Sequence, residues 1–221
     1  MATKENRSYS RPAIKKVLSV KSESAISAVD TYLNSTLSAI YALDVILFFI
    51  SDEATSEAAN SKVSATFDEK LKFFNKKIHT AQKQVEEMEL DEIVYTQEFT
   101  KEYLVFSPLC GQYIQLMKKF DILTNLIDQL WLNGQISSGE RKEQNNKLQR
   151  HMLNVSRHVI NASRTAMRLA QAAGKEKEVQ ESVAKIGVSE KLAKEVLDTT
   201  KAMQSVTQED SDETEPTVLS A

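Results

Sequence analysis

The stretch from Leu104 to Ile136, LVFSPLCGQYIQLMKKFDILTNLIDQLWLNGQI, contains a helix start, an apolar face and a helix stop. Ser107 is a good N-cap residue, and Pro108 suits the first helical position because proline already has a helical φ and needs no N–H there. Apolar residues then recur at steps of three and four, the spacing that lines one face of a helix. Asn133-Gly134 ends the pattern, since glycine readily adopts the left-handed conformation found at many helix ends. The stretch therefore predicts a buried central helix.

The composition favours a mainly α protein. Five glycines and three prolines among 221 residues leave few tight turns, and the periodic segments are long. The net charge of −3 argues against a uniformly basic nucleic-acid binder. We expect a flexible basic arm (1–12), a main domain (13–174) made of a ribbon-helix-helix-like unit (13–50) and a helical body (61–174), two short C-terminal helices (175–206) and a disordered acidic tail (207–221).

Two features indicate a cytoplasmic protein without a membrane partner. Cys110 is the only cysteine, so it cannot form an internal disulfide and suits a reducing compartment. The most apolar run, from Leu37 to Ile50, is fourteen residues long and contains Asp44. This run predicts neither a membrane span nor a signal peptide.

The N-terminal region predicts a short strand in basic surroundings. Residues 15–21 alternate, with Leu18 and Val20 on one face and Ser19 and Lys21 on the other. The segment from Met1 to Ser24 contains six basic residues and two acidic ones. The possible short strands around 93–106 form the other β-favouring region, either as two strands or as an extended crossover.

Two helices follow the N-terminal strand in the sequence pattern. Ser22 or Ser24 can cap the first, Asn34-Ser35 offers a break, and Leu37 to Ile50 forms the second. This order is that of a ribbon-helix-helix module, in which two chains pair their strands into a ribbon that fits the DNA major groove. The alternative is that residues 13–21 are an extended edge or linker leading into a helical bundle.

Further helices are expected along the rest of the chain. Residues 51–61 are small and acidic and predict a loop or a frayed helix end, whereas an amphipathic helix is expected from Val63 to Met88. The lysines on the other side of this helix indicate a solvated face. The capping box Ser137-Ser-Gly-Glu140 opens a helix that runs to Ala173, and Gly174 closes it.

This last helix carries a second basic surface. The segment from Glu140 to Ala173 contains seven basic residues and only two acidic ones. Arg150, Arg157, Arg164 and Arg168 follow at steps of seven, seven and four, which places them on one side of the helix, as a row able to follow a phosphate backbone. The alternative is that these arginines pair with acidic residues of the region 25–60.

The chain resembles a known family through short motifs. In order, these are Ile93-Val94, Gln97, Leu104, Phe106-Ser107-Pro108, Tyr113, Leu116, Phe120-Asp121, Leu123, Gly134 and Arg141. Together with the strand around Leu18-Ser19-Val20, they resemble the AcaB-like proteins of integrative conjugative elements and conjugative plasmids. The resemblance covers about residues 14–170 and implies an accessory protein of a mobile element. The best-known member of the family acts as a transcriptional coactivator of transfer genes.

We therefore expect a homodimeric DNA-binding transcriptional regulator that pairs its N-terminal strands. Ser19 and Lys21 would face bases, while Lys15, Lys16 and the arm would hold phosphates. The candidate DNA-binding residues are Arg7, Arg11, Lys15, Lys16, Ser19, Lys21, Arg150, Arg157 and Arg164. A transcription activator or RNA polymerase is a further candidate partner.

The alternative function is a helical interaction protein of the conjugative transfer machinery that touches no DNA. No phosphate loop, metal-ligand motif or nucleophile motif is found in the sequence. We expect neither an enzyme nor a cofactor.

Overall fold

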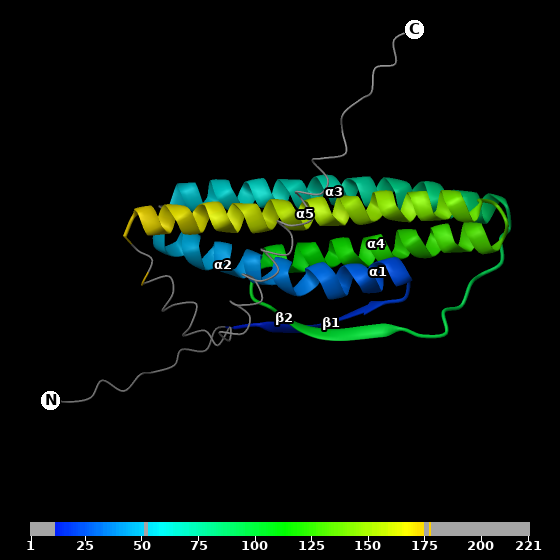
Figure 1. Cartoon of the computed structure of the whole chain (residues 1–221), viewed down its shortest axis with the longest axis horizontal. Helices are drawn as coiled ribbons and strands as arrows, with labels where there is room; N and C mark the ends of the chain where they lie inside the picture. The colour runs from blue at the N-terminus through cyan, green and yellow to red at the C-terminus, as the bar shows by residue number, and fades with distance from the viewer. Residues whose placement is uncertain (1–11, 51–52, 175–176, 178–221) are drawn as a thin grey trace, which may run out of the picture.

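The computed structural model describes residues 12–50, 53–174 and 177. The elements are β1 (Ile14–Val20), α1 (Glu23–Ala28), η1 (Val29–Leu33), α2 (Asn34–Ile50), α3 (Glu53–Glu87), β2 (Phe99–Val105), α4 (Pro108–Leu132) and α5 (Ser138–Ala172). The long helices lie along one axis, with α3 and α5 in one layer, α2, α1 and α4 in the next, and the β1–β2 ribbon beyond them (Figure 1). The predicted mainly α fold with a short N-terminal strand is confirmed.

The central helix has the predicted boundaries. α4 begins at Pro108 after Ser107, whose backbone is extended, and it ends at Leu132. Gly134 has a φ of 72°, the left-handed conformation for which glycine is suited. At the start of α5, Ser137 Oγ accepts the N–H of Glu140 at 3.2 Å, and Glu140 Oε2 accepts the N–H of Ser137 at 2.8 Å. Both halves of the predicted capping box are therefore formed.

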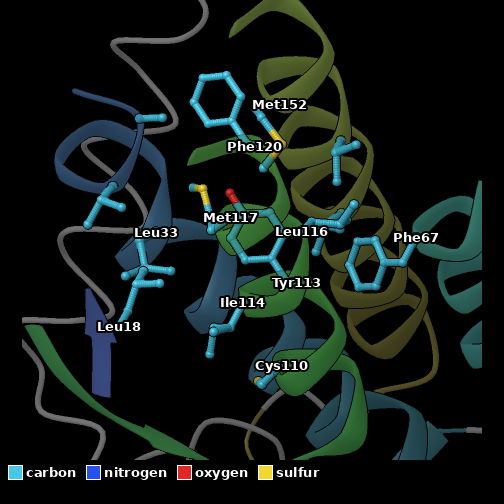
Figure 2. Packing of buried hydrophobic residues seen from close by; sticks show 14 of the residues in the cluster. Leu18, Leu33, Phe67, Cys110, Tyr113, Ile114, Leu116, Met117, Phe120 and Met152 are labelled. Atoms are coloured by element: carbon cyan, nitrogen blue, oxygen red, sulfur yellow. The ribbon is translucent and has the colours of Figure 1, made fainter. Parts of the chain in front are cut away.

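The hydrophobic core is built around α4. The apolar and aromatic side chains of α4 without solvent exposure are Tyr113, Leu116, Met117 and Phe120. Leu18 of β1 and Phe67 of α3 approach them from opposite sides, and Met152 of α5 packs beside Phe120 (Figure 2). The Tyr113 hydroxyl lies 2.8 Å from Ser156 Oγ of α5, so the buried phenol has a hydrogen-bond partner. Each layer of the molecule thus contributes to one core.

The break predicted at Asn34-Ser35 is wrong. Ser22 does cap α1, with its Oγ accepting the N–H of Ala25 at 3.2 Å. However, α1, η1 and α2 follow one another without interruption, and Asn34 has a helical φ of −63°. η1 is a π-helical turn, which inserts an extra residue into the helical repeat. Ser35 Oγ donates to the carbonyl of Tyr32 at 3.1 Å, so this serine is accommodated within the helix.

The expectation of a loop or frayed end over residues 51–61 is also wrong for its described part. α3 already begins at Glu53, and the alanines of this segment explain why, since alanine has the highest helix propensity. The apolar face predicted for this helix is confirmed, because Val63, Phe67, Phe74 and Ile78 are buried.

Residues 91–106 form a crossover and one strand. Residues 91–95 have no regular secondary structure, and β2 begins only at Phe99. The crossover and β2 carry the chain back along the bundle, so that α3 and α4 run in the same direction (Figure 1). Of the two arrangements considered for this segment, the crossover is present, followed by a single strand.

The apolar helix α2 is 17 residues long. Among the described residues, no helix combines the length and the apolar character that crossing a membrane requires.

Candidate nucleic-acid interface

The strand β1 has two faces of opposite character. Leu18 and Val20 have no solvent exposure, and β1 packs on α4. Lys15, Val17 and Ser19 alternate with them on the outer face, where Val17 is 48% exposed. The alternation predicted from the sequence is confirmed by this burial pattern.

The strand partner of β1 lies in the same chain. β1 pairs antiparallel with β2, so that Ser19 lies opposite Thr100 and Val17 lies opposite Glu102. The sheet has two strands, and the second edge of β1 therefore has no strand partner among the described residues. Because a strand has two edges, pairing with β2 uses only one of the two edges of β1.

The polar residues of the outer face contact carboxylates of β2 and of the residue before it. Ser19 Oγ donates a hydrogen bond to Glu98 and lies 3.4 Å from Thr100 Oγ1. Lys15 Nζ lies 2.5 Å from Glu102 Oε2, and both side chains are more than half exposed. Such an exposed pair contributes at most about 1 kcal/mol, so a phosphate could compete for the lysine. The sequence pattern around residues 15–21 gave no sign of these carboxylates.

Lys16 and Lys21 are exposed residues of the same region. Lys16 lies on the same face of β1 as the buried Leu18 and Val20, but near the exposed start of the strand. Lys21 lies one residue beyond the end of the strand. The backbone N–H of Lys21 donates to Asp121 Oδ1 at 3.1 Å, so the position of this residue is fixed while its ammonium group stays in solvent. Arg7 and Arg11 lie outside the described residues.

Asp121 of α4 fixes the junction between β1 and α1. Its buried carboxylate accepts hydrogen bonds from the N–H of Ser22 and from the Ser22 hydroxyl, both at 2.9 Å, besides the one from Lys21. Thr124 Oγ1 lies 2.6 Å from Ser22 Oγ and completes the cluster. A carboxylate is favourable there because the first N–H groups of a helix lack partners and carry partial positive charge. Sequence reasoning placed Asp121 only in a family motif and assigned it no role, although an aspartate directly after Phe120 in an apolar stripe was a usable signal.

The arginine row of α5 lies on a different part of the molecule. Arg150 is exposed, and Arg157 and Arg164 are partly buried. Among the residues whose side chains are described, none of these three forms an ion pair with a carboxylate. The predicted pairing with acidic residues of the region 25–60 is therefore not found there. Burial and the neighbouring charge of Arg168 lower the pKa of Arg164.

Arg157 links the arginine row to η1. Burial raises the pKa of Tyr32 and the charge of Arg157 opposes that shift, so the two side chains are near one another. The Nε of Arg157 is buried and has no hydrogen-bond partner among the described residues. The second arginine of the row therefore lies near the π-helical turn.

The two basic regions are not brought into one cluster. β1 packs on β2 and α4, whereas α5 packs mainly on α2 and α4. α5 lies in the layer away from the ribbon (Figure 1). A single DNA surface that contains both Lys15 and Arg157 is therefore not formed within one chain.

These elements define a class of protein: a bundle of long helices, α2 to α5, that carries an antiparallel two-stranded ribbon formed by the N-terminal strand and the strand before α4. Neither a search of family models nor a search of curated proteins gives a match. The crystal structure of selenomethionine-containing AcaB from uropathogenic E. coli has this fold, with a TM-score of 0.75 and 24% sequence identity, over 86% of this chain and 99% of that one. The AcaB-like resemblance expected from the sequence is confirmed in its fold.

Proposed function

We propose that this protein is a DNA-binding transcriptional regulator of a conjugative mobile element that acts as a homodimer. In this proposal, β1 of one copy pairs with β1 of a second copy, and a basic face around the paired strands contacts DNA. A transcription activator or RNA polymerase would be the protein partner that turns binding into regulation. The fold shared with AcaB supports the proposal.

The observation that carries the proposal is the second edge of β1, which has no strand partner among the described residues. An open strand edge presents a row of N–H and C=O groups that favours pairing with another strand. Antiparallel pairing of two copies would form a sheet in the order β2, β1, β1, β2. The outer rows of both β1 strands, with Lys15, Val17 and Ser19, would then lie side by side at its centre.

The remaining candidate residues would hold phosphates. Lys16 and Lys21 are exposed beside the ribbon, and no ion pair of theirs is found among the described residues. Arg150, Arg157 and Arg164 would provide a separate phosphate contact on α5. Because each neutralised phosphate releases counterions, the affinity for DNA would fall steeply with salt.

Fluorescence anisotropy with a duplex DNA of random sequence, measured across a salt series, tests this proposal. We expect binding at low salt, a decline as salt rises, and a shallower decline in Lys16→Ala. Lys72→Ala is the matched control, because Lys72 is exposed on α3 and belongs to neither basic region. Light scattering at micromolar concentration tests the paired strands: a monomer would contradict them, because one copy cannot form the β1–β1 ladder.

A second candidate function is that of a helical accessory protein of the transfer machinery that does not bind DNA. The observation that favours it is the position of Glu98 and Glu102 on the outer face of the ribbon, where they engage Ser19 and Lys15. Carboxylates on this face repel phosphates. Absence of DNA binding even at low salt would favour this function over the first.

A further inference from the structure

A groove lies at the end of the bundle where α3 and α4 finish. It has a volume of about 650 Å³ and is formed by the last turn of α3, the crossover and the second half of α4. Leu90, Ile93 and Leu126 are partly buried along it, while Val94 is 91% exposed and Ile122 is 39% exposed. A valine so fully exposed beside other apolar side chains is a mark of an interaction surface.

The rim of this groove is acidic. Glu86, Glu89 and Glu92 line it, and Lys21 is its one basic residue. The sequence from Gln84 to Phe99 contains six acidic residues and no lysine or arginine. A rim of this charge repels nucleic acid and attracts a basic partner.

The conformation of Glu89 is the second unusual feature of the rim. Glu89 has a φ of 49°, and among the described residues it is the only one other than glycine in the left-handed region. It ends α3, with its N–H donating to the carbonyl of Glu86 at 3.2 Å and the N–H of Leu90 donating to that of Val85 at 3.1 Å. Glycine would fit this position with less strain, so the chain places a carboxylate there at a conformational cost.

The crossover wall of the groove is held in place by hydrogen bonds to α4 and to the residue that follows it. The N–H of Asp91 donates to Asn133 Oδ1 at 3.1 Å, and Gln129 Nε2 donates to the carbonyl of Asp91 at 3.0 Å. The Tyr95 hydroxyl donates to Asp128 Oδ2 at 2.8 Å. A wall fixed before binding reduces the ordering that a partner must impose.

The geometry points to a docking site for a basic amphipathic helix of a partner protein. The apolar residues of that helix, spaced three and four apart, would contact Leu90, Ile93 and Val94. Its flanking lysines or arginines would face Glu86, Glu89 and Glu92. No residue of β1 lines the groove, so the docking site is distinct from the outer face of the strand, although Lys21, a candidate phosphate contact, lies at its rim.

The test uses the full-length protein and a fluorescein-labelled synthetic peptide of 18 residues as the probe. One peptide has leucines along a single helical face and lysines elsewhere, and the other has the same composition in an order that spreads the leucines around the helix. We expect the first to bind about tenfold more tightly, because only it offers an apolar face. Equal binding of the two peptides would overturn the proposal, since it would reflect charge alone.

Variants then locate the site. Glu89→Lys and Val94→Asp should each weaken binding of the first peptide by about tenfold, through the rim charge and the apolar wall respectively. Asp68→Lys is the matched control, because Asp68 is an exposed acid on α3 outside the groove. A loss in Asp68→Lys as large as that in Glu89→Lys would overturn the assignment.

Glu89→Gly separates docking from folding. This variant removes both the carboxylate and the strain of the left-handed conformation. It should therefore weaken binding of the first peptide, while the melting temperature of the protein stays equal or rises. A lower melting temperature with unchanged peptide binding would show that Glu89 serves only to end α3, and would contradict its assignment to the docking site.

Discussion

The outer face of the ribbon and the arginine row of α5 are both basic in sequence, but their charges are arranged differently. On the ribbon, Lys15 and Ser19 already contact Glu102 and Glu98. On α5, Arg150, Arg157 and Arg164 form no ion pair among the residues whose side chains are described. The net charge of a sequence segment therefore does not determine how many of its charged side chains remain available to a ligand. Lys15 and Ser19 acquire their carboxylate neighbours across the strand pair, from sequence about 80 residues away, whereas no carboxylate of the described residues pairs with these three arginines.

The largest effect is expected from the residue that holds the ribbon in place. Asp121→Ala would leave the N–H groups of Lys21 and Ser22 without their acceptor and should lower the free energy of unfolding by about 2–4 kcal/mol. Urea denaturation measures this loss. Asp68→Ala is the control, and a similar loss in both variants would mean that the hydrogen bonds of Asp121 contribute little.

The second effect concerns the arginine row. If it contacts DNA, the combined change of Arg150, Arg157 and Arg164 to alanine should reduce the slope of log affinity against log salt by about 2 to 3, because up to three phosphate contacts are lost. Anisotropy with duplex DNA measures the slope. An unchanged slope would exclude this row from the DNA contact and leave the ribbon as the candidate.

The ribbon is tested by removing its carboxylates. Glu98→Gln combined with Glu102→Gln keeps the side-chain shapes but removes two negative charges beside Ser19 and Lys15. Binding to DNA at low salt should become a few-fold tighter, since each exposed pair contributes up to about 1 kcal/mol. Weaker or unchanged binding would show that the ribbon face does not meet phosphates.

The smallest effect is a pH dependence next to the arginine row. Burial and the charge of Lys70 lower the pKa of His151, whose ring lies 4.6 Å from that of Phe73. The folded state therefore favours the neutral ring, and the stability gained in this way is present above the ordinary pKa of about 6.5 and is lost as the pH falls towards the lowered value.

The midpoint of urea denaturation should accordingly fall between pH 7 and pH 5, and less so in His151→Gln. His79→Gln, at an exposed position of α3, should retain the full dependence. A dependence equally reduced in both variants would contradict the assignment to His151.

The parts of the fold that were predictable have local signals. The start of α4 follows from Pro108 at its first position, although Ser107 makes no side-chain capping hydrogen bond, and the end of α4 and the start of α5 follow from Asn133-Gly134 and from Ser137 with Glu140. The burial of Leu18 and Val20 follows from simple alternation. Such signals need no knowledge of the tertiary fold.

The missed features depend on distant partners. Asn34-Ser35 resembles a helix break in sequence, but the chain stays helical there, because η1 joins α1 to α2 without interruption. The pairing of β1 with β2 and the contacts of Ser19 and Lys15 join segments about 80 residues or more apart. Of the candidate DNA-binding residues, the sequence identified the cations, but it could not identify the carboxylates placed beside them.

The hydrogen bond from Lys21 to Asp121 joins residues that are 100 positions apart. At a translation rate of about 5–20 residues per second, β1 leaves the ribosome roughly 5 to 20 s before Asp121 does. During this interval the strand has neither β2 nor α4 to cover it, so Leu18, Val20 and both of its edges are open to nascent chains on neighbouring ribosomes. During synthesis the strand is therefore exposed to aggregation for this interval, and a chaperone bound to β1 would shield it until β2 and α4 are available.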